Sequence, residues 1–312
     1  MPNGTRRGGR DEPLWIDLWH GDRPTFGVPG LSGPWVDVVG RVAVAGGRTA
    51  TLAATLNRRT AFSVPVTPDG AFHIQIMASR LRPGANRLSL EARTEGGRIG
   101  HRSLILRLQT NRVWPIPWSW DAGQSSADGE PRAVEGRWLA AGGAWCSEGP
   151  GVGSLAFGDR IWRDVDVTVT LALRALGGGP EEASVALVLR WAGHTARPAP
   201  GVVDWSPWGA TARLGYLPEI EGLGLALATG DPGMPDRAPR HRAVDGLLRE
   251  GARLDVRAFA RSRPGLASAY GVKVWLHGTP EPPEWQITAE GVAGEPARGA
   301  CLLAVRNAAV AV

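Results

Sequence analysis

Apolar and polar residues alternate along most of this chain, which is the pattern of β-strands with one buried face. In residues 71–77 (AFHIQIM), for example, Phe72, Ile74 and Ile76 face one way and polar residues separate them. Turn residues divide the first third of the chain into predicted strands at 35–44, 48–57, 71–77, 86–93 and 101–109. About seven short strands in about 100 residues indicate an immunoglobulin-like (Ig-like) β-sandwich over residues 13–112.

The alternation becomes longer and stricter in the second part of the chain. Residues 164–173 (DVDVTVTLAL) place valine or leucine at every second position. Further strands are predicted at 183–191, 222–228, 253–261, 270–277 and 300–307, with a few helical turns near 241–250. One apolar face per strand fits two antiparallel sheets packed face to face. The predicted fold class is therefore all-β, with the Ig-like sandwich followed by a concanavalin A-like jelly-roll sandwich over residues 113–312.

A tryptophan-rich segment interrupts the strands between these two regions. In residues 114–136 (WPIPWSWDAGQSSADGEPRAVEG) prolines exclude a central strand, and Ser, Gly and Asp residues follow. We expect Trp114, Trp118 and Trp120 to pack between the two domains, with an aromatic ligand platform as the alternative. Residues 1–12 are polar and rich in Gly and Arg, so a disordered tail is expected.

Charge and cysteine content exclude several classes of protein. The chain carries a formal charge of +5, and no basic block has interleaved aromatic residues, so nucleic-acid binding is not expected. Cys146 and Cys301 lack a metal-binding or redox spacing, and two separate buried thiols are expected rather than a disulfide. Because neither a signal-peptide core nor a long apolar run occurs, we expect no membrane span. The protein should be soluble, and either cytoplasmic or exported without a conventional signal peptide.

Several phrases that occur together are typical of one protein family. They are TFGVPGLSGPWVDVVGRV (25–42), LRPGANRLSLEA (81–92), WPIPWSWD (114–121), FGDRIWRDVDVTV (157–169), LRWAGHT (189–195) and KVWLHGTPEPPEW (273–285). From about residue 14 onward, the chain resembles a family of mostly uncharacterised bacterial proteins that join an Ig-like or cadherin-like domain to a LamG-like, concanavalin A-like jelly roll. The resemblance implies this fold. For function it implies carbohydrate binding, glycan hydrolysis or lyase chemistry on a concave sheet face.

The first candidate ligand site is the segment at 189–210 (LRWAGHTARPAPGVVDWSPWGA). The C–H faces of sugars stack on indole rings, and sugar hydroxyls bind planar polar side chains; both kinds of group occur here. The candidate ligand-binding residues are Arg190, Trp191, His194, Asp204, Trp205 and Trp208. Trp191 also continues the apolar face of the preceding strand, so a place in the core is the alternative for this residue.

A second candidate site lies on the polar face of the strand at 270–277, which carries Lys273, Trp275 and His277. A neighbouring predicted strand offers Arg257 in the same alternating way, so these side chains would share a surface if the two strands pair. Such a face suits an acidic or neutral glycan, and an ordinary solvated face is the alternative. In a lyase, Lys273, His277 and Arg257 would neutralise and deprotonate an acidic sugar.

Glu219 and Glu221 are weak candidates for catalytic carboxylates, because residues i and i+2 of a strand point to one side. They lack the third acid of the E-x-D-x-x-E and E-x-D-x-E motifs of concanavalin A-like glucanases. Calcium is the cofactor that the sequence allows, although no calcium-loop or zinc motif occurs. The loop carboxylates that could contribute are Asp159, Asp164, Asp231 and Asp236.

The sequence therefore favours a carbohydrate-binding or recognition protein that uses a Trp- and Arg-lined face or loop of the jelly roll. Two alternatives stay open: a polysaccharide-active lyase or glycoside hydrolase on the same face, and a biosynthetic cyclase or isomerase with an aromatic pocket. Two ionisable groups converging beside Trp205 and Trp208 would favour an enzyme. An open groove would favour a glycan, and a closed pocket an apolar ligand.

Overall fold

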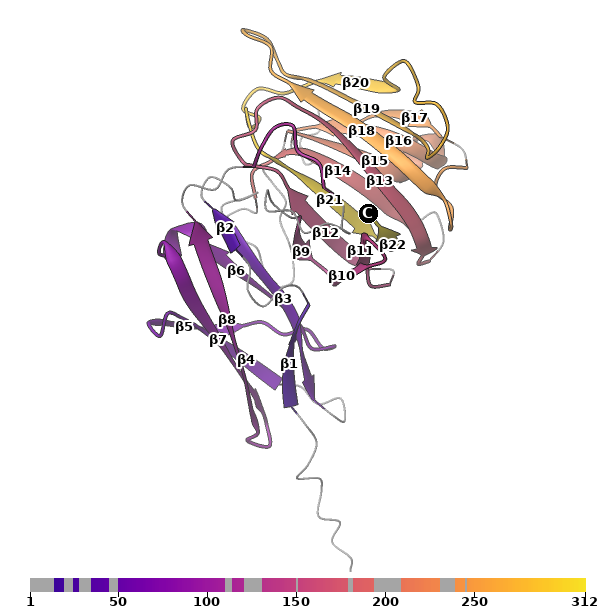
Figure 1. Cartoon of the computed structure of the whole chain (residues 1–312). Coiled ribbons are helices and arrows are strands. Elements are labelled where there is room, and N and C mark those ends of the chain that lie inside the picture. Colours follow the sequence, from indigo (N-terminus) through magenta and orange to yellow (C-terminus); the bar gives the residue numbers. More distant parts are fainter. Residues whose placement is uncertain are drawn as a thin grey trace, which may run out of the picture.

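The structure is a computed structural model of the chain (Figure 1). It describes residues 14–19, 25–27, 35–44, 50–109, 114–120, 131–149, 151–178, 182–193, 209–230, 239–244 and 246–312. Within these residues the fold is all-β, as predicted, and the only helical elements are two 3-10 turns, Ala78–Arg80 and Pro218–Ile220. The helical turns predicted near 241–250 are wrong for the described part of that stretch, where Arg240–Ala243 form a strand. The tail predicted at 1–12 lies outside the described residues.

The first part of the chain forms two sheets that face each other (Figure 1). One sheet has the strand order β1-β3-β6 and the other the order β2-β8-β7-β4-β5, with all pairs antiparallel except β2 with β8. The strands are β1 (Leu14–Leu18), β2 (Thr25–Gly27), β3 (Trp35–Val44), β4 (Ala50–Leu56), β5 (Thr60–Val64), β6 (Ala71–Met77), β7 (Gly84–Thr94) and β8 (Ile99–Gln109).

The alternating residues of this first sandwich close a single core. Ile74 and Ile76 of β6 are buried, as are Leu104 and Leu106 of β8 in the opposite sheet, and all four belong to one apolar cluster. This is the result that the alternation predicts for two sheets packed face to face.

The second part of the chain forms a larger sandwich of two seven-stranded antiparallel sheets. We call the sheet with the order β10-β11-β22-β13-β18-β19-β20 the groove sheet, and the sheet with the order β17-β16-β15-β14-β21-β12-β9 the back sheet. The strands are β9 (Arg132–Glu135), β10 (Trp138–Ala141), β11 (Ala144–Ser147), β12 (Val152–Phe157), β13 (Val165–Leu176), β14 (Ser184–Trp191), β15 (Ala210–Leu217), β16 (Gly222–Thr229), β17 (Arg240–Ala243), β18 (Arg253–Arg261), β19 (Ala269–Leu276), β20 (Ile287–Glu290), β21 (Ala300–Arg306) and β22 (Ala308–Ala311).

The core of the second sandwich lies between the groove sheet and the back sheet. Leu187 and Leu189 of β14 pack in the same cluster as Leu254 and Val256 of β18. Each of these residues stands at an alternate position of its strand, as the sequence pattern predicts. The first sandwich touches this one through contacts between β3 and β9.

Both cysteines are free thiols, and they stand in opposite sheets. Cys301 belongs to β21 of the back sheet and is buried, whereas Cys146 belongs to β11 of the groove sheet and is partly exposed. Burial raises the pKa of the Cys301 thiol to about 12. The expectation of two unpaired thiols agrees with this arrangement, but Cys146 is less buried than expected.

This difference predicts unequal thiol reactivity. In the folded protein at pH 8, a disulfide reagent such as DTNB should modify Cys146 and leave Cys301 intact, because only the thiolate of an accessible cysteine reacts. In denaturant both thiols should react. A Cys146→Ser variant is the control and should show no fast phase; fast reaction of that variant in native buffer would contradict the burial of Cys301.

Candidate functional site

The groove sheet is incomplete along one edge of β13. β18 pairs with β13 from Val165 to Ala172, but β22 pairs with it only from Ala172 to Leu176. Beyond β22, β11 is joined to the sheet through one residue pair. Among the described strands none pairs with this edge of residues 165–171, so a gap separates the first half of β13 from the β10–β11 hairpin.

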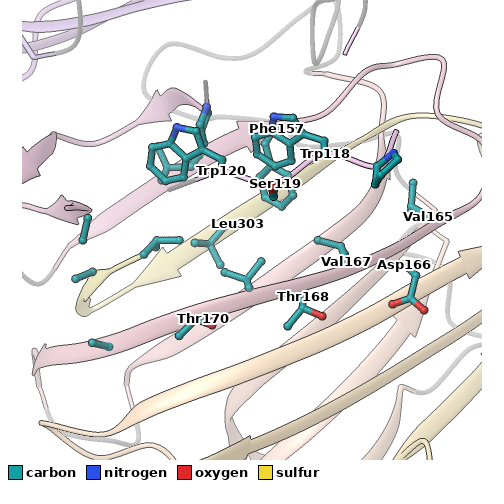
Figure 2. Close-up of a pocket in the computed structure, with 18 of the residues that line it drawn as sticks. Trp118, Ser119, Trp120, Phe157, Val165, Asp166, Val167, Thr168, Thr170 and Leu303 are labelled. Carbon is teal, nitrogen blue, oxygen red and sulfur yellow. The ribbon is translucent and has the colours of Figure 1, made fainter. Parts of the chain in front are cut away.

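A groove with a volume of about 1010 Å³ occupies this gap (Figure 2). Every residue of β13 from Val165 to Thr170 lines it, and these residues belong to both faces of the pleated strand. The groove therefore meets the edge of β13 rather than one of its faces. Leu155, Phe157 and Leu303 of the back sheet line its apolar floor.

The tryptophan-rich segment at 114–120 forms the opposite wall of the groove (Figure 2). Trp118 stacks on Phe157 of the floor with ring centroids 5.8 Å apart, and Trp114 meets Trp118 edge-on at 4.9 Å. Trp120 lies 6.3 Å from Trp145 of β11. Trp114 is buried in the core of the second sandwich and Trp118 packs against that core, which corrects the expectation that they fill a seam between domains.

A buried carboxylate anchors this wall. Asp159 is fully buried and accepts hydrogen bonds from the backbone N–H groups of Ile161 at 3.0 Å and Trp114 at 3.5 Å. Burial raises the pKa of Asp159 above its ordinary value. Trp162, in the same turn, packs edge-on against Trp114 at 6.3 Å and lines the groove. Asp159 thus holds the tryptophan wall in place.

The outer face of the groove sheet carries the second predicted site. Arg257 of β18 and Lys273 of β19 are cross-strand partners, which confirms that they share a surface. Both cations are already paired. Arg257 binds Asp166 through two bonds of 2.8 and 2.9 Å and Glu281 through one of 2.7 Å, and Lys273 Nζ lies 2.6 Å from Glu281. The hydrogen bonds that Arg257 donates to Asp166 and Glu281 raise the pKa of Arg257.

The segment that follows β19 folds back over these cations. Lys273 Nζ donates to the carbonyl oxygen of Pro282 at 2.7 Å and lies 4.9 Å from the ring centroid of Trp285. Hydrogen bonds from Lys273 and Arg257 lower the pKa of Glu281. Because Lys273 is only 5% exposed, it cannot serve as the base of a lyase in this conformation.

A smaller part of the outer face stays open, and we call it the outer patch: Trp275, His277, Asp255 and Thr170. Asp255 and Trp275 are cross-strand partners, and Trp275 is partly exposed. The Asp255 carboxylate accepts hydrogen bonds from Thr170 Oγ1 at 2.6 Å and from His277 Nδ1 at 3.0 Å. The His277 side chain is 40% exposed. An indole and an oriented imidazole therefore stand side by side at the surface.

The first predicted site is only partly described, and its described residues are structural. Trp191 is buried at 2% exposure, but it does not continue the face of Leu187 and Leu189. A register shift between Leu189 and Trp191, with Arg190 in the left-handed region at φ 53°, turns Trp191 to the other face of the back sheet. There it packs with a separate cluster that includes Val188. His194, Asp204, Trp205 and Trp208 lie outside the described residues.

Arg190 crosses from the back sheet to the groove sheet inside the sandwich. Its side chain is 1% exposed and lies 3.6 Å from Glu295, whose side chain is 6% exposed. Its guanidinium also donates to the hydroxyls of Ser268 at 2.6 Å, Ser262 at 2.9 Å and Tyr270 at 3.4 Å. A side chain this buried and this fully bonded holds the two sheets together and is not available to a ligand.

The predicted carboxylate pair does not occur. Glu219 lies in the 3-10 turn Pro218–Ile220 between β15 and β16, and Glu221 follows it in the left-handed conformation at φ 48°. Both residues are exposed. The i, i+2 spacing therefore does not place them on one face of a strand, and the interpretation as a catalytic pair is wrong.

A metal cluster and a membrane-spanning helix are both absent from the part of the chain that the structure describes. There, no group of three or more His, Cys, Asp or Glu side chains is placed to hold a metal ion. Asp164, another predicted loop carboxylate, accepts the backbone N–H of Ser262, which lowers the pKa of Asp164. Asp231 and Asp236 lie outside this part. In the same residues, no helix has the length and apolar character needed to cross a membrane.

The sequence reasoning missed the groove. Its edge residues, Thr168 and Thr170, were visible only as polar positions of a regular strand. The nearest sequence feature was the cluster of Trp114, Trp118 and Trp120, for which a ligand platform was the second choice. The pattern within β13 does not show which of its residues pair with β22, because that pairing joins distant parts of the chain.

Comparisons with known proteins leave the family open. No protein-family model and no curated protein matches the chain. Among solved structures, a chain described as "Structural insight into host cell surface retention of a 1.5-MDa bacterial ice-binding adhesin" shares 10% sequence identity, with 74% of this chain and 95% of that chain covered. The TM-score is 0.24, which is too low to support a statement about fold or function.

Proposed function

We propose that this protein is a carbohydrate-binding recognition protein, and that the outer patch of the second sandwich contacts the saccharide. The observation that carries the proposal is the partly exposed indole of Trp275 beside His277, whose ring the Asp255 carboxylate orients. An indole face stacks on the apolar face of a sugar ring, and the exposed imidazole nitrogen binds a hydroxyl. From the resemblance in sequence, we also propose that the first sandwich is Ig-like and the second LamG-like.

Binding is better supported than catalysis on this face. Asp166 and Glu281 are held by Arg257 and Lys273, and Asp255 is held by Thr170 and His277. A glycosidase needs two carboxylates that can act on the sugar, and these carboxylates are already engaged.

An aromatic cyclase pocket also fits less well. Trp118, Trp120 and Trp162 line a groove along an open strand edge, whereas a cyclase encloses its substrate (Figure 2). An open site suits a chain-like ligand.

The test is a titration calorimetry screen of the full chain against soluble cello-, xylo- and chito-oligosaccharides, with Trp275→Ala as the variant. We expect at least one saccharide to bind, and Trp275→Ala to weaken that binding by at least about tenfold, because a stacked aromatic contributes about 1 kcal/mol beyond its buried area.

The matched control is Trp15→Ala. Trp15 is 48% exposed and lies in β1 of the first sandwich, so its loss should leave the affinity unchanged. Unchanged binding by Trp275→Ala, or equal losses in both variants, would remove the outer patch as the site. If no saccharide binds, the carbohydrate proposal itself fails.

A further inference from the structure

The edge of β13 that no described strand pairs with offers backbone hydrogen-bonding groups to the groove. Leu173 N–H donates to the carbonyl of Ala252, and the Leu173 carbonyl accepts from Gly251, so the backbone groups of Leu173 point toward β18. Backbone direction alternates along a strand. The N–H and C=O groups of Asp166, Thr168 and Thr170 therefore point the other way, into the groove.

The inner side of the groove is apolar and incompletely covered. Val165 and Val167 face the core between the two sheets, yet both stay partly exposed, whereas Val169 and Leu171 further along the same face are buried. None of the described strands lies on this side of the two valines, because β22 pairs with β13 only from Ala172 to Leu176. A chain lying beside β13 would cover these two valines.

Together these two features mark a strand position beside β13 that none of the described residues fills. Backbone groups at every second residue match an extended polypeptide, and the floor of Leu155, Phe157 and Leu303 accepts every second side chain of that polypeptide. The length from Val165 to Ala172 is about 23 Å at 3.3 Å per residue. A saccharide has no groups with this two-residue alternation of polar edge and apolar face.

We propose that the groove binds an extended peptide segment of a partner protein, which adds to the groove sheet as a strand antiparallel to β13. This goes beyond the proposed saccharide binding, because it uses the edge of β13 rather than Trp275 and His277, with Thr170 as the residue that both surfaces share, and a different class of ligand. The orientation follows from β22, which occupies the same side of β13 further along the strand and runs antiparallel to it. The added strand continues that line.

The chemistry of the segment follows from its neighbours. Apolar residues at alternate positions face Val167 and the floor, and small polar residues between them lie beside Thr168 and Thr170 on the outer side. Asp164 lines the far end of the groove with a side chain that is 55% exposed, so a basic residue belongs at the C-terminal end of the segment.

The probe is an acetylated, amidated and fluorescein-labelled peptide of about eight residues that alternates valine with threonine and ends in lysine. Directly opposed residues of antiparallel strands share a face, so the threonines carry the N–H groups that bond to β13. In fluorescence anisotropy, N-methylation of the threonines should weaken binding by at least about tenfold. N-methylation of the valines should leave the affinity close to that of the parent peptide.

A protein variant tests the same site from the other side. Val167→Lys places a charge against the apolar side of the added strand and should also weaken binding by at least about tenfold. Val152→Lys is the matched control, because Val152 is 54% exposed on β12 and does not line the groove. If Val167→Lys fails to fold, the methylated peptides still decide the result with the unchanged protein.

Four results would overturn the proposal: no saturable binding of the alternating peptide, equal effects of the two methylation patterns, displacement of the peptide by an oligosaccharide, or dimerisation of the free protein through this edge. Loss of binding with methylated valines alone would overturn the antiparallel orientation. The two proposals fail independently, because Trp275→Ala should change saccharide binding only and Val167→Lys should change peptide binding only.

Discussion

Arg190→Ala is expected to lower the free energy of unfolding by about 3–5 kcal/mol, since removing one partner leaves the other charge buried. Glu295 is the stranded partner, with its side chain 6% exposed, and Ser262, Ser268 and Tyr270 lose their hydrogen bonds to the guanidinium. In differential scanning calorimetry the second sandwich should melt about 10 °C lower. Arg190→Lys should rescue little, because one ammonium group cannot reach partners on several sides.

The matched control for this experiment is Arg263→Ala. Arg263 pairs with Glu290 at 2.8 Å, but the two side chains are 36% and 69% exposed, so the loss should stay within about 1 kcal/mol. If Arg190→Ala lowers the free energy of unfolding by no more than Arg263→Ala does, the buried arginine does not stabilise the contact between the two sheets more than a surface arginine would.

Trp114→Ala is expected to lower the free energy of unfolding, measured by urea denaturation, by about 3–5 kcal/mol, because it removes a buried indole from the core. Trp114 is 3% exposed and supports Trp118, the residue that stacks on the groove floor. The variant should therefore also weaken peptide binding in the groove.

Ile116→Ala is the matched control for Trp114→Ala. Ile116 lies in the same segment but is 67% exposed, and surface truncations of this kind stay within about 0.5 kcal/mol. Equal losses in the two variants would show that the segment is anchored by its backbone, through Asp159, rather than by the indole of Trp114.

Alternation predicted the strands well because it is a property of each strand alone. The predicted ranges 35–44, 71–77 and 253–261 coincide with β3, β6 and β18, and the proposed neighbour relation of Arg257 and Lys273 is confirmed by their register. Both features depend on which face of its strand each side chain occupies. The two-residue period of apolar and polar positions in the sequence indicates that face directly.

The errors concern residues whose environment is set by distant parts of the chain. Trp191 changes face because Arg190 takes a left-handed conformation, and Gly299 makes room for it: a Cβ there would lie 2.4 Å from the carbonyl carbon of Arg190. Lys273 is covered because Glu281 and Pro282 fold back over it. Neither event alters the local pattern of apolar and polar residues, so neither could be predicted from it.

The candidate sites also divide into features set within one strand, which the sequence predicts, and features set by distant residues, which it does not. Trp275 and His277 could be placed on one face from their spacing alone, and the structure keeps them on the surface. The groove depends on where β22 ends relative to β13, a relation between residues more than a hundred positions apart.

The weak attachment of the β10–β11 hairpin has a consequence for motion. The hairpin joins the rest of its sheet through one residue pair with β22, two backbone hydrogen bonds between Trp145 and Val312, and a bond from Val310 N–H to Ser147 Oγ. Elements with few ladder bonds open at a lower free energy than the body of a domain. Trp138 of β10 stays buried in the core, so opening at low free energy should be confined to the tip of the hairpin at 142–144, which lines the groove.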